Sequence, residues 1–488
     1  MTKRENGGAE PGSEQPAMVA GSAGTRWPRR RLLRWALGLV PVMAGGSWAA
    51  SHWLRPSTRR MGDDGAEPDG PVDGWRAEAG LERGGPPEGA PDARTRAELW
   101  TREATVECFA RHPQTLIRLD LALRADDDYA PAHLVYACWF IEHDRPDLAR
   151  KELSHPSLKD TPESSLLSEL MERRPQSPDW RHAFFEAWKA LGRPDFSKSP
   201  LLLETVEDDD ILPFAVRGLD ELEERRRLPV VTLLTKEEES HPEWGFDAIR
   251  ASDSVPLLMA LRERLLVLPA QEPARQQLLP AAEARLTQLT GPTLSTLQLA
   301  LRTFLAQRPP EALFQRRDLE ALEPLVSLEW KQPSSEHFFR QMYEHLDGLL
   351  VVPGHHAFLL ATWAQGVSLG KELQRRARAS AAHLNENERR WMGRLLWEVG
   401  TRLREQHSRL ELERGLLLQV YGSELTGHSP TRMESIDLWV DLGRWEEALK
   451  RSGFKRWPLA SLHEESCEPR MRDEHIWLKA FAGKNELP

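Results

Sequence analysis

Residues 385–403 read NENERRWMGRLLWEVGTRL, and this segment has the pattern of one amphipathic helix. Asn385 and Glu388 have the spacing of a capping box, in which each side chain accepts a hydrogen bond from the backbone N–H of the other residue. The apolar residues that follow recur at three- and four-residue intervals, which places them on one helix face: Trp391, Met392, Leu395, Leu396, Val399 and Leu403. We therefore predict a helix that starts at this box and buries one face.

Helical periodicity continues on both sides of this segment, with Gly and Pro at short intervals and almost no alternating strand pattern. We predict further helices at 98–111, 131–143, 180–191, 213–226, 255–266, 280–289, 294–306, 336–349 and 356–378. Only 229–234 and 349–352 have a strand-like composition, and each is short enough to be the buried end of a helix. The predicted fold class is all-α, a helical-hairpin repeat or solenoid-like array.

The N-terminal part has a different character. Residues 1–25 are rich in Gly, Glu, Ser and Ala, which predicts a disordered cytoplasmic tail. Five arginines between Arg26 and Arg34 then precede residues 35–53, where His52 is the only ionisable side chain. A bilayer-spanning helix needs about 20 such residues, and a basic flank keeps the N-terminus in the cytoplasm. We predict a signal-anchor at 26–55, in a bacterial inner membrane, with the rest of the chain in the periplasm.

A cleavable export signal is the alternative for the same segment. The apolar run is followed by the small residues Ser47, Ala49 and Ala50, as in a signal-peptidase site. Arg30-Arg31 with two leucines after it resembles the twin-arginine export motif, although Arg29 precedes it. The uncharged run continues to Leu54, beyond the small residues, which favours an uncleaved anchor. A buried or interfacial helix in a cytoplasmic protein is a further reading, but it would need a polar face.

A linker and one large domain follow the anchor. Residues 56–94 are mostly Pro, Gly, Asp, Glu and Arg, with too few apolar residues to offset the entropy of ordering, so we predict a flexible spacer. Residues 95–488 form the predicted all-helical domain, with subdivisions expected near 200–240 and 350. The spacer would hold this domain away from the bilayer, where it can reach a partner.

The composition limits the classes of partner that the chain is expected to bind. The 488 residues carry a formal net charge of −10, whereas nucleic-acid binders normally present a basic stripe. We predict a protein or peptide partner and no nucleic acid. Cys108, Cys138 and Cys467 form no CxxC spacing. The first two lie among apolar residues, as buried thiols do, although an exported domain would permit a bridge between them.

Two segments resemble tetratricopeptide repeats. In 119–156, small residues stand where two antiparallel helices would cross: Ala122, Ala132, Ala137 and Ala149. Asp144 replaces the usual glycine of the turn. In 436–452, Gly443 occupies the turn position and Ala448 the small position, and 188–196 is a weaker echo. The resemblance implies hairpins of packed helices and a peptide-binding groove. Its copies do not recur at the regular period of about 34 residues, and any stack of helical hairpins could produce such turns.

No pattern in the sequence predicts a catalytic, cofactor or metal site, and we assign none of these residues or groups. The adjacent histidines His355 and His356, the pair His463 and Cys467 four residues apart, and the acidic run 207–210 each lack the further ligands of a metal site. The arginines 225–227 follow glutamates at ion-pairing distances on a helix, which favours a solvated face.

Two functional hypotheses remain. The first is a non-catalytic, membrane-anchored scaffold that binds a protein along a groove. The alternative is a periplasmic helical-toroid enzyme that acts on glycans, which would stack sugar rings on exposed indoles and use paired carboxylates or a His–Glu pair. The tryptophans that bear on this choice lie among apolar residues at helical spacing, which favours core packing: Trp100, Trp139, Trp188, Trp391, Trp397 and Trp439.

Overall fold

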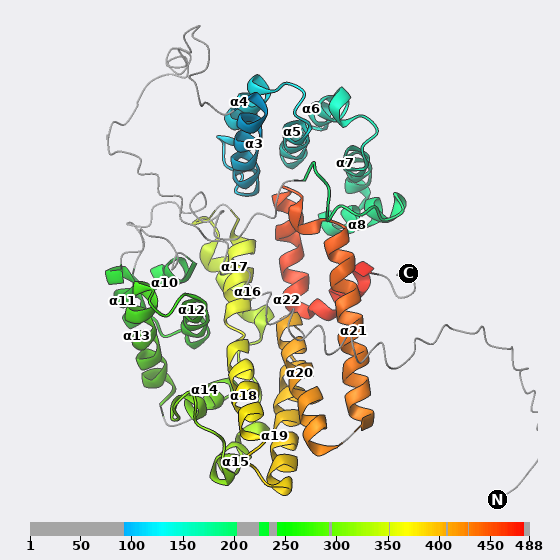
Figure 1. The fold of residues 1–488 in the computed structure, drawn as a ribbon. Helices are drawn as coiled ribbons and strands as arrows, with labels where there is room; N and C mark the ends of the chain where they lie inside the picture. Colours follow the sequence, from blue (N-terminus) through cyan, green and yellow to red (C-terminus); the bar gives the residue numbers. More distant parts are fainter. Residues whose placement is uncertain are drawn as a thin grey trace, which may run out of the picture. The chain divides into compact units, whose positions relative to one another are not determined.

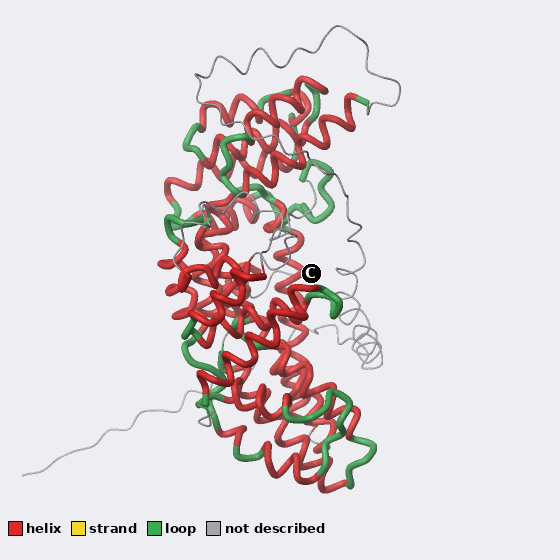
Figure 2. Tube along the Cα trace, turned by 90° about the vertical axis from the view of Figure 1, so that its left-hand side faces the viewer, coloured by secondary structure: helices red, strands yellow, loops and turns green. Residues whose placement is uncertain are grey.

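The computed structural model describes residues 92–202, 224–233, 242–291, 295–350, 352–406, 408–427 and 429–482. They belong to a compact unit that runs from Pro87 to Pro488. Figures 1 and 2 show helices and loops and no β-strand in the described residues. An isolated bridge joins Asp347 and Leu350. The predicted all-α class is confirmed.

In chain order the α-helices are α3 (Ala93–Phe109), α4 (Thr115–Ala125), α5 (Ala130–Glu142), α6 (Pro146–Leu153), α7 (Pro162–Arg173), α8 (Trp180–Ala190), α10 (Glu224–Leu233), α11 (Pro242–Ala251), α12 (Val255–Val267), α13 (Pro273–Thr290), α14 (Leu297–Ala306), α15 (Arg316–Leu322), α16 (Ser335–Leu346), α17 (Pro353–Trp363), α18 (Val367–Ser380), α19 (Glu386–Arg404), α20 (Arg409–Thr426), α21 (Ser429–Arg451) and α22 (Ala460–Ala482). Short 3-10 turns lie at Pro156–Leu158, Arg174–Gln176, Leu325–Ser327 and Phe454–Arg456.

The predicted membrane anchor is not among these helices. The predicted tail at 1–25, the anchor at 26–55 and nearly all of the linker at 56–94 lie outside the described residues. In the part of the chain that is described, no helix combines the length and the apolar character needed to cross a membrane. The first described helix, α3, begins at Ala93, and the Asp92 side chain caps it by accepting a hydrogen bond from Thr95 N at 2.6 Å.

The helix predicted from 385–403 is α19, and its capping box is formed as expected. Asn385 Oδ1 accepts from Glu388 N at 2.9 Å, and Glu388 Oε2 accepts from Asn385 N at 3.1 Å. Of the predicted apolar stripe, Trp391 is partly buried and the other five residues are buried. The stripe packs into the largest apolar cluster of the described residues.

α19 and α20 form an antiparallel hairpin whose backbones touch at four glycines. A Cβ added at Gly400 would lie 2.6 Å from the carbonyl oxygen of Gly415, and one added at Gly393 would lie 2.7 Å from that of Gly422. Real Cβ atoms essentially never come so close to another backbone. The four glycines therefore allow these helices a closer approach than any side chain would permit, and we call this contact the glycine seam.

The first helices pair as hairpins, α3 with α4, α5 with α6 and α7 with α8. The four alanines predicted to lie at the helix crossing, 122, 132, 137 and 149, are fully buried. Asp144 has φ 54°, the left-handed conformation in which a glycine was expected. Gly192 at φ 76° and Arg193 at φ 60° end α8 in the same way.

The second repeat-like segment differs from its prediction. Gly443 lies inside α21 and not at a turn, so the expected hairpin at 436–452 is wrong. The buried residues Leu442, Trp445 and Leu449 follow at helical spacing on both sides of the glycine, so the helix continues through it. A Cβ at Gly443 would meet nothing within 4 Å.

The single helix predicted at 356–378 is also wrong, because the chain breaks between α17 and α18. Gly366 takes φ 64°, and a Cβ there would clash with the side-chain amide of Gln298. That amide donates to the carbonyl of Ala364 at 2.8 Å, and Trp330 Nε1 donates to the next carbonyl at 3.3 Å. Side chains from elsewhere in the chain thus satisfy the carbonyls that the break releases.

Smaller differences concern helix ends. The helix predicted to begin at Pro280 begins at Pro273, and Pro280 lies in its interior. The strand-like segment 229–234 is largely α10, with Pro229 inside the helix. Leu349 and Leu350 lie in a turn. Most of the helix predicted at 213–226 lies outside the described residues.

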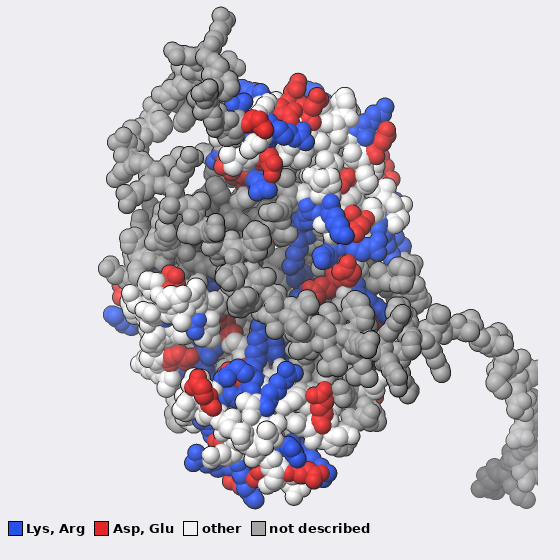
Figure 3. Space-filling model, viewed as in Figure 1, with Lys and Arg blue, Asp and Glu red and all other residues white. Residues whose placement is uncertain are grey.

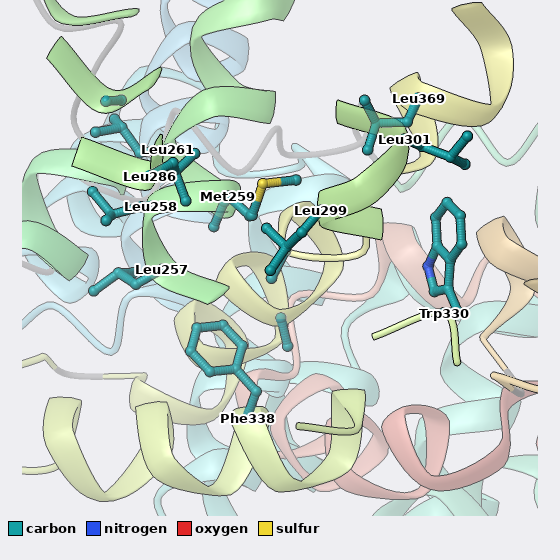
Figure 4. Close-up of a cluster of buried hydrophobic side chains, with 14 of the residues drawn as sticks. Leu257, Leu258, Met259, Leu261, Leu286, Leu299, Leu301, Trp330, Phe338 and Leu369 are labelled. Carbon is teal, nitrogen blue, oxygen red and sulfur yellow. The ribbon is translucent and has the colours of Figure 1, made fainter. Parts of the chain in front are cut away.

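Two apolar clusters meet along α22. Figure 4 shows part of the larger one, where leucines of α12, α13, α14 and α18 surround Met259, Trp330 and Phe338. Cys467 and Met471 of α22 belong to this cluster. Trp477 of the same helix belongs to a second cluster, which α5 to α8 and α20 to α22 build. α22 thus joins the early hairpins to the later helices.

Candidate functional site

The adjacent histidines at the start of α17 do not converge on one point. The ring centroids of His355 and His356 are 5.7 Å apart at an interplanar angle of 78°. His356 is fully buried, and its Nδ1 donates to the carbonyl of Val352 at 2.8 Å. Within the described ranges, no group of His, Cys, Asp and Glu has the geometry to hold a metal ion.

His463 and Cys467 are not paired through their functional groups. The thiol of Cys467 donates to the backbone carbonyl of His463 at 3.2 Å. The imidazole Nε2 donates to the carbonyl of Trp457 at 3.0 Å, and the ring packs against Phe109 and Phe454. Burial lowers the pKa of His463 to about 3. This histidine is a neutral packing residue at physiological pH.

The remaining features singled out in the sequence are two cysteines and two charged runs. Cys108 and Cys138 are buried free thiols, and burial raises the pKa of both. Cys108 donates to the carbonyl of Pro458 at 3.3 Å. The acidic run 207–210 and the side chains of Arg225 and Arg226 lie outside the described residues.

The tryptophans that bear on the glycan hypothesis are wholly or partly buried. Trp139 and Trp188 are buried, and those at 100, 391, 397 and 439 are partly buried. Trp391 Nε1 donates to Glu323 Oε1 at 3.1 Å, which ties the indole to α15 and its following turn. All of these indoles except that of Trp397 belong to or pack against the apolar clusters between helices.

A His–Glu pair exists, but it lies inside a hairpin. His133 Nδ1 lies 2.7 Å from Glu152 Oε2, and His133 Nε2 lies 2.9 Å from the carbonyl of Asp127. His155 stacks on the ring at 3.8 Å. Burial alone would lower the pKa of His133, but the hydrogen bonds to Glu152 and to the Asp127 carbonyl outweigh it and raise that pKa. Both ring nitrogens face acceptors, so the imidazolium links α5 to α6.

A buried ion pair joins the loop before α16 to α20. Lys331 Nζ donates to Glu411 Oε1 at 2.6 Å and to Ser335 Oγ at 2.7 Å, and Ser408 Oγ donates to Glu411 Oε2 at 2.7 Å. Burial lowers the pKa of Lys331 and raises that of Glu411, while their mutual attraction opposes both shifts. The adjoining cavity measures about 20 Å³. That volume holds one water molecule, not a substrate.

A larger surface hollow of about 510 Å³ lies over the loop between α14 and α15. Asp318 is the only carboxylate among its lining residues. Asp318 Oδ1 accepts from Arg308 Nε at 2.8 Å, and Oδ2 accepts from the backbone N–H of Gln315 at 2.8 Å. One carboxylate oxygen thus caps α15 and the other is paired with Arg308, and the hollow does not present a pair of acid and base groups.

Three cations converge on the face shared by α18 and α20. We call Lys371, Arg378 and Arg414 the cationic triad. Lys371 and Arg378 are exposed at a seven-residue interval on α18, and Arg414 is partly buried on α20. In the part of the chain that is described, no carboxylate oxygen lies within 4.0 Å of their nitrogens. Figure 3 shows Lys and Arg side chains gathered over the region where α18 and α20 lie in Figure 1.

Neutral groups hold the two arginines of the triad in place. A Cβ at Gly370 would lie 2.7 Å from Arg414 Cγ, so the arginine stem packs across this glycine. Arg414 Nη1 donates to Gln374 Oε1 at 3.1 Å. The guanidinium of Arg378 lies 5.1 Å from the ring centroid of Tyr421. The side chains are positioned without losing their charge to an ion pair.

The members of the triad repel one another. The pKa of Arg414 is lowered to about 10, mainly by burial and in part by repulsion from Arg378, while the attraction of Glu413 opposes the shift. Burial and Arg414 lower the pKa of Lys371. Like charges brought together in a partly desolvated position favour a bound anion, because the anion relieves the repulsion.

Sequence reasoning missed this surface. Lys371 and Arg378 carry a weak signal, since residues seven apart share a helix face, but Arg414 belongs to another helix, and only the folded chain shows that it joins them. None of the three comparisons, with protein-family models, with curated proteins and with solved structures, finds a match for this chain.

Proposed function

We propose that the chain is a non-catalytic, membrane-anchored interaction protein, which presents a tetratricopeptide-like helical domain outside the cytoplasm and binds a protein partner there. The observation that carries this proposal is the cationic triad. Its three charges come from two helices, neutral groups hold its two arginines, and no carboxylate among the described residues forms an ion pair with any of the three. Such a surface binds a charged group on a partner and offers no acid–base pair for chemistry.

Two further features support the proposal. The buried alanines at the crossings of the first hairpins match the packing of tetratricopeptide-like units, whose stacks bind peptides. The arginines at 26–34 before the uncharged run 35–53 support an anchor with the following domain outside the cytoplasm. A solenoid-like array on a spacer suits a protein that reaches for its partner.

Topology and partner capture together test this function. A reporter that is active only outside the cytoplasm is fused to the C-terminus of the full chain, and membrane retention is measured after alkaline extraction. We expect an active reporter on a chain that stays in the membrane fraction with its N-terminal segment uncleaved. In-cell crosslinking should then yield one discrete protein adduct.

Location, membrane anchoring and partner binding can each fail separately in this test. An inactive reporter would overturn the predicted location, and release by alkaline extraction would overturn the anchor. An exported chain without any protein adduct would overturn the interaction role and turn attention to glycan binding.

A further inference from the structure

We infer that the face formed by α18 and α20 is the docking site for an acidic segment of the partner protein, with the cationic triad of Lys371, Arg378 and Arg414 as its anchor. This inference rests on the proposed function and names the chemistry of the partner. Its first basis is geometry. The seven-residue spacing of Lys371 and Arg378 aligns both along α18, and Arg414 packs against the same helix from α20.

Preorganisation is the second basis. Arg414 packs across Gly370 and is held by Gln374, while Arg378 is held over Tyr421. An acidic ligand therefore meets side chains that have already lost much of their conformational freedom, which reduces the entropy cost of binding. A guanidinium also presents paired N–H donors that match the two oxygens of a carboxylate.

Charge complementarity selects a short acidic segment over an extended polyanion. Carboxylates flank the triad, since Glu372 pairs with Arg375 and Arg376 on α18, and Glu413 pairs with Arg409 on α20. These glutamates are neutralised by their own arginines, so they do not cancel the charge of the triad. The net charge of −10 over the whole chain repels an extended polyanion more strongly than a short acidic segment, because the repulsion grows with the charge of the ligand. Three cations on the face shared by α18 and α20 match a segment with a few carboxylates.

The test is fluorescence anisotropy of a labelled peptide, rich in Glu and Asp and without cations, titrated with the purified full-length chain. We expect binding that weakens as NaCl is raised. Each substitution Lys371→Gln, Arg378→Gln and Arg414→Gln should weaken binding by roughly 3- to 10-fold, as expected for loss of one charge-assisted contact at a partly exposed site. Arg124→Gln removes an exposed charge from α4 and should leave the affinity unchanged.

The variants also report on folding. Neutralising one member of the triad removes mutual repulsion, so we expect the thermal midpoint to stay the same or to rise. If the Arg414 variant fails to fold, the exposed Arg378→Gln still decides the result. A Lys-rich peptide of equal length serves as the matched control and should not bind.

Several outcomes would overturn the inference. The first is no binding of the acidic peptide to the unmodified chain. The second is that all three variants bind the peptide as tightly as the unmodified chain does. The third is that an RNA oligomer or vesicles with anionic lipids bind more tightly than the peptide and do so through the triad. Crosslinking in cells distinguishes failure of the docking site from failure of the proposed interaction role. A partner that still crosslinks to a chain without the triad would leave the interaction role standing and refute the docking site.

Discussion

The glycine seam between α19 and α20 makes a sharp prediction for Gly400→Ala. The new Cβ would lie 2.6 Å from the carbonyl oxygen of Gly415, about 0.8 Å short of the 3.4 Å at which ordinary contact begins. The opposing atom is backbone, so it cannot move aside as a side-chain end can. Overpacking of this kind lowers the free energy of unfolding by up to about 3 kcal/mol. Replacing a helical glycine by alanine raises it by about 1 kcal/mol through helix propensity.

We therefore expect Gly400→Ala to lower the free energy of unfolding by about 2 kcal/mol. The matched control is Gly443→Ala, where the added Cβ meets nothing within 4 Å. This change should stabilise the chain by about 0.5–1 kcal/mol through helix propensity alone. Urea titrations give the difference, and hydrogen exchange of the α19 and α20 amides locates it. A Gly400→Ala chain as stable as the Gly443→Ala chain would refute the close contact.

Three further predictions concern buried ionisable groups. The pKa of His463 is lowered to about 3. The stability that the neutral ring supports is therefore present above about pH 6.5 and is lost as the pH falls, by about 2 kcal/mol at pH 5. His463→Phe should flatten this part of the curve of unfolding free energy against pH, measured by urea titration. The pKa of His133 is raised, so its stabilisation is present below about pH 6.5 and is lost as the pH rises through the folded-state pKa. The protection factors of the α5 and α6 amides, which are corrected for the intrinsic pH dependence of exchange, should fall over that rise, and His133→Gln should abolish the fall. Lys331→Met leaves the carboxylate of Glu411 buried alone and should cost about 3–5 kcal/mol in urea unfolding, whereas Lys331→Met with Glu411→Leu should recover most of that loss.

Each of these predictions has a contrary result. An unchanged acid limb in His463→Phe would mean that this ring is not the neutral, desolvated group described above. Amide exchange in α5 and α6 that follows the same pH dependence with and without His133 would exclude an imidazolium link. A double variant no more stable than Lys331→Met alone would show that the ion pair is not the reason for the loss.

Local signals predicted the helices well where they were complete. The capping box at Asn385 and the apolar stripe after it specify α19 from neighbouring residues alone, and the structure forms both. The buried alanines of the first hairpins could be predicted for the same reason, since small residues allow helices to cross closely.

The errors arise where distant residues decide the structure. The break at Gly366 depends on Gln298 and Trp330, which supply donors to the released carbonyls from other parts of the chain. Gly443 has the local pattern of a turn, but packing of Leu442 and Trp445 keeps α21 helical. No window of neighbouring residues contains this information.

The two features that matter most here are pairings between helices. The glycine seam had a readable signal, two glycines seven residues apart in each of two consecutive helices, 393 with 400 and 415 with 422. The cationic triad had none beyond Lys371 and Arg378, because the contact of α18 with α20 brings in Arg414. The candidate site could therefore be found only in the folded chain.

The most direct test of the central claim is photo-crosslinking in the native host, with the full-length chain and a photoreactive residue in place of Leu417. This residue is partly exposed on α20, three positions after Arg414, and the control position is Val267, which is 72% exposed on α12. The account predicts a discrete protein adduct from position 417 that weakens when Arg414 is changed to Gln, and none from position 267. Equal adducts from both positions, or no adduct from 417, would contradict it.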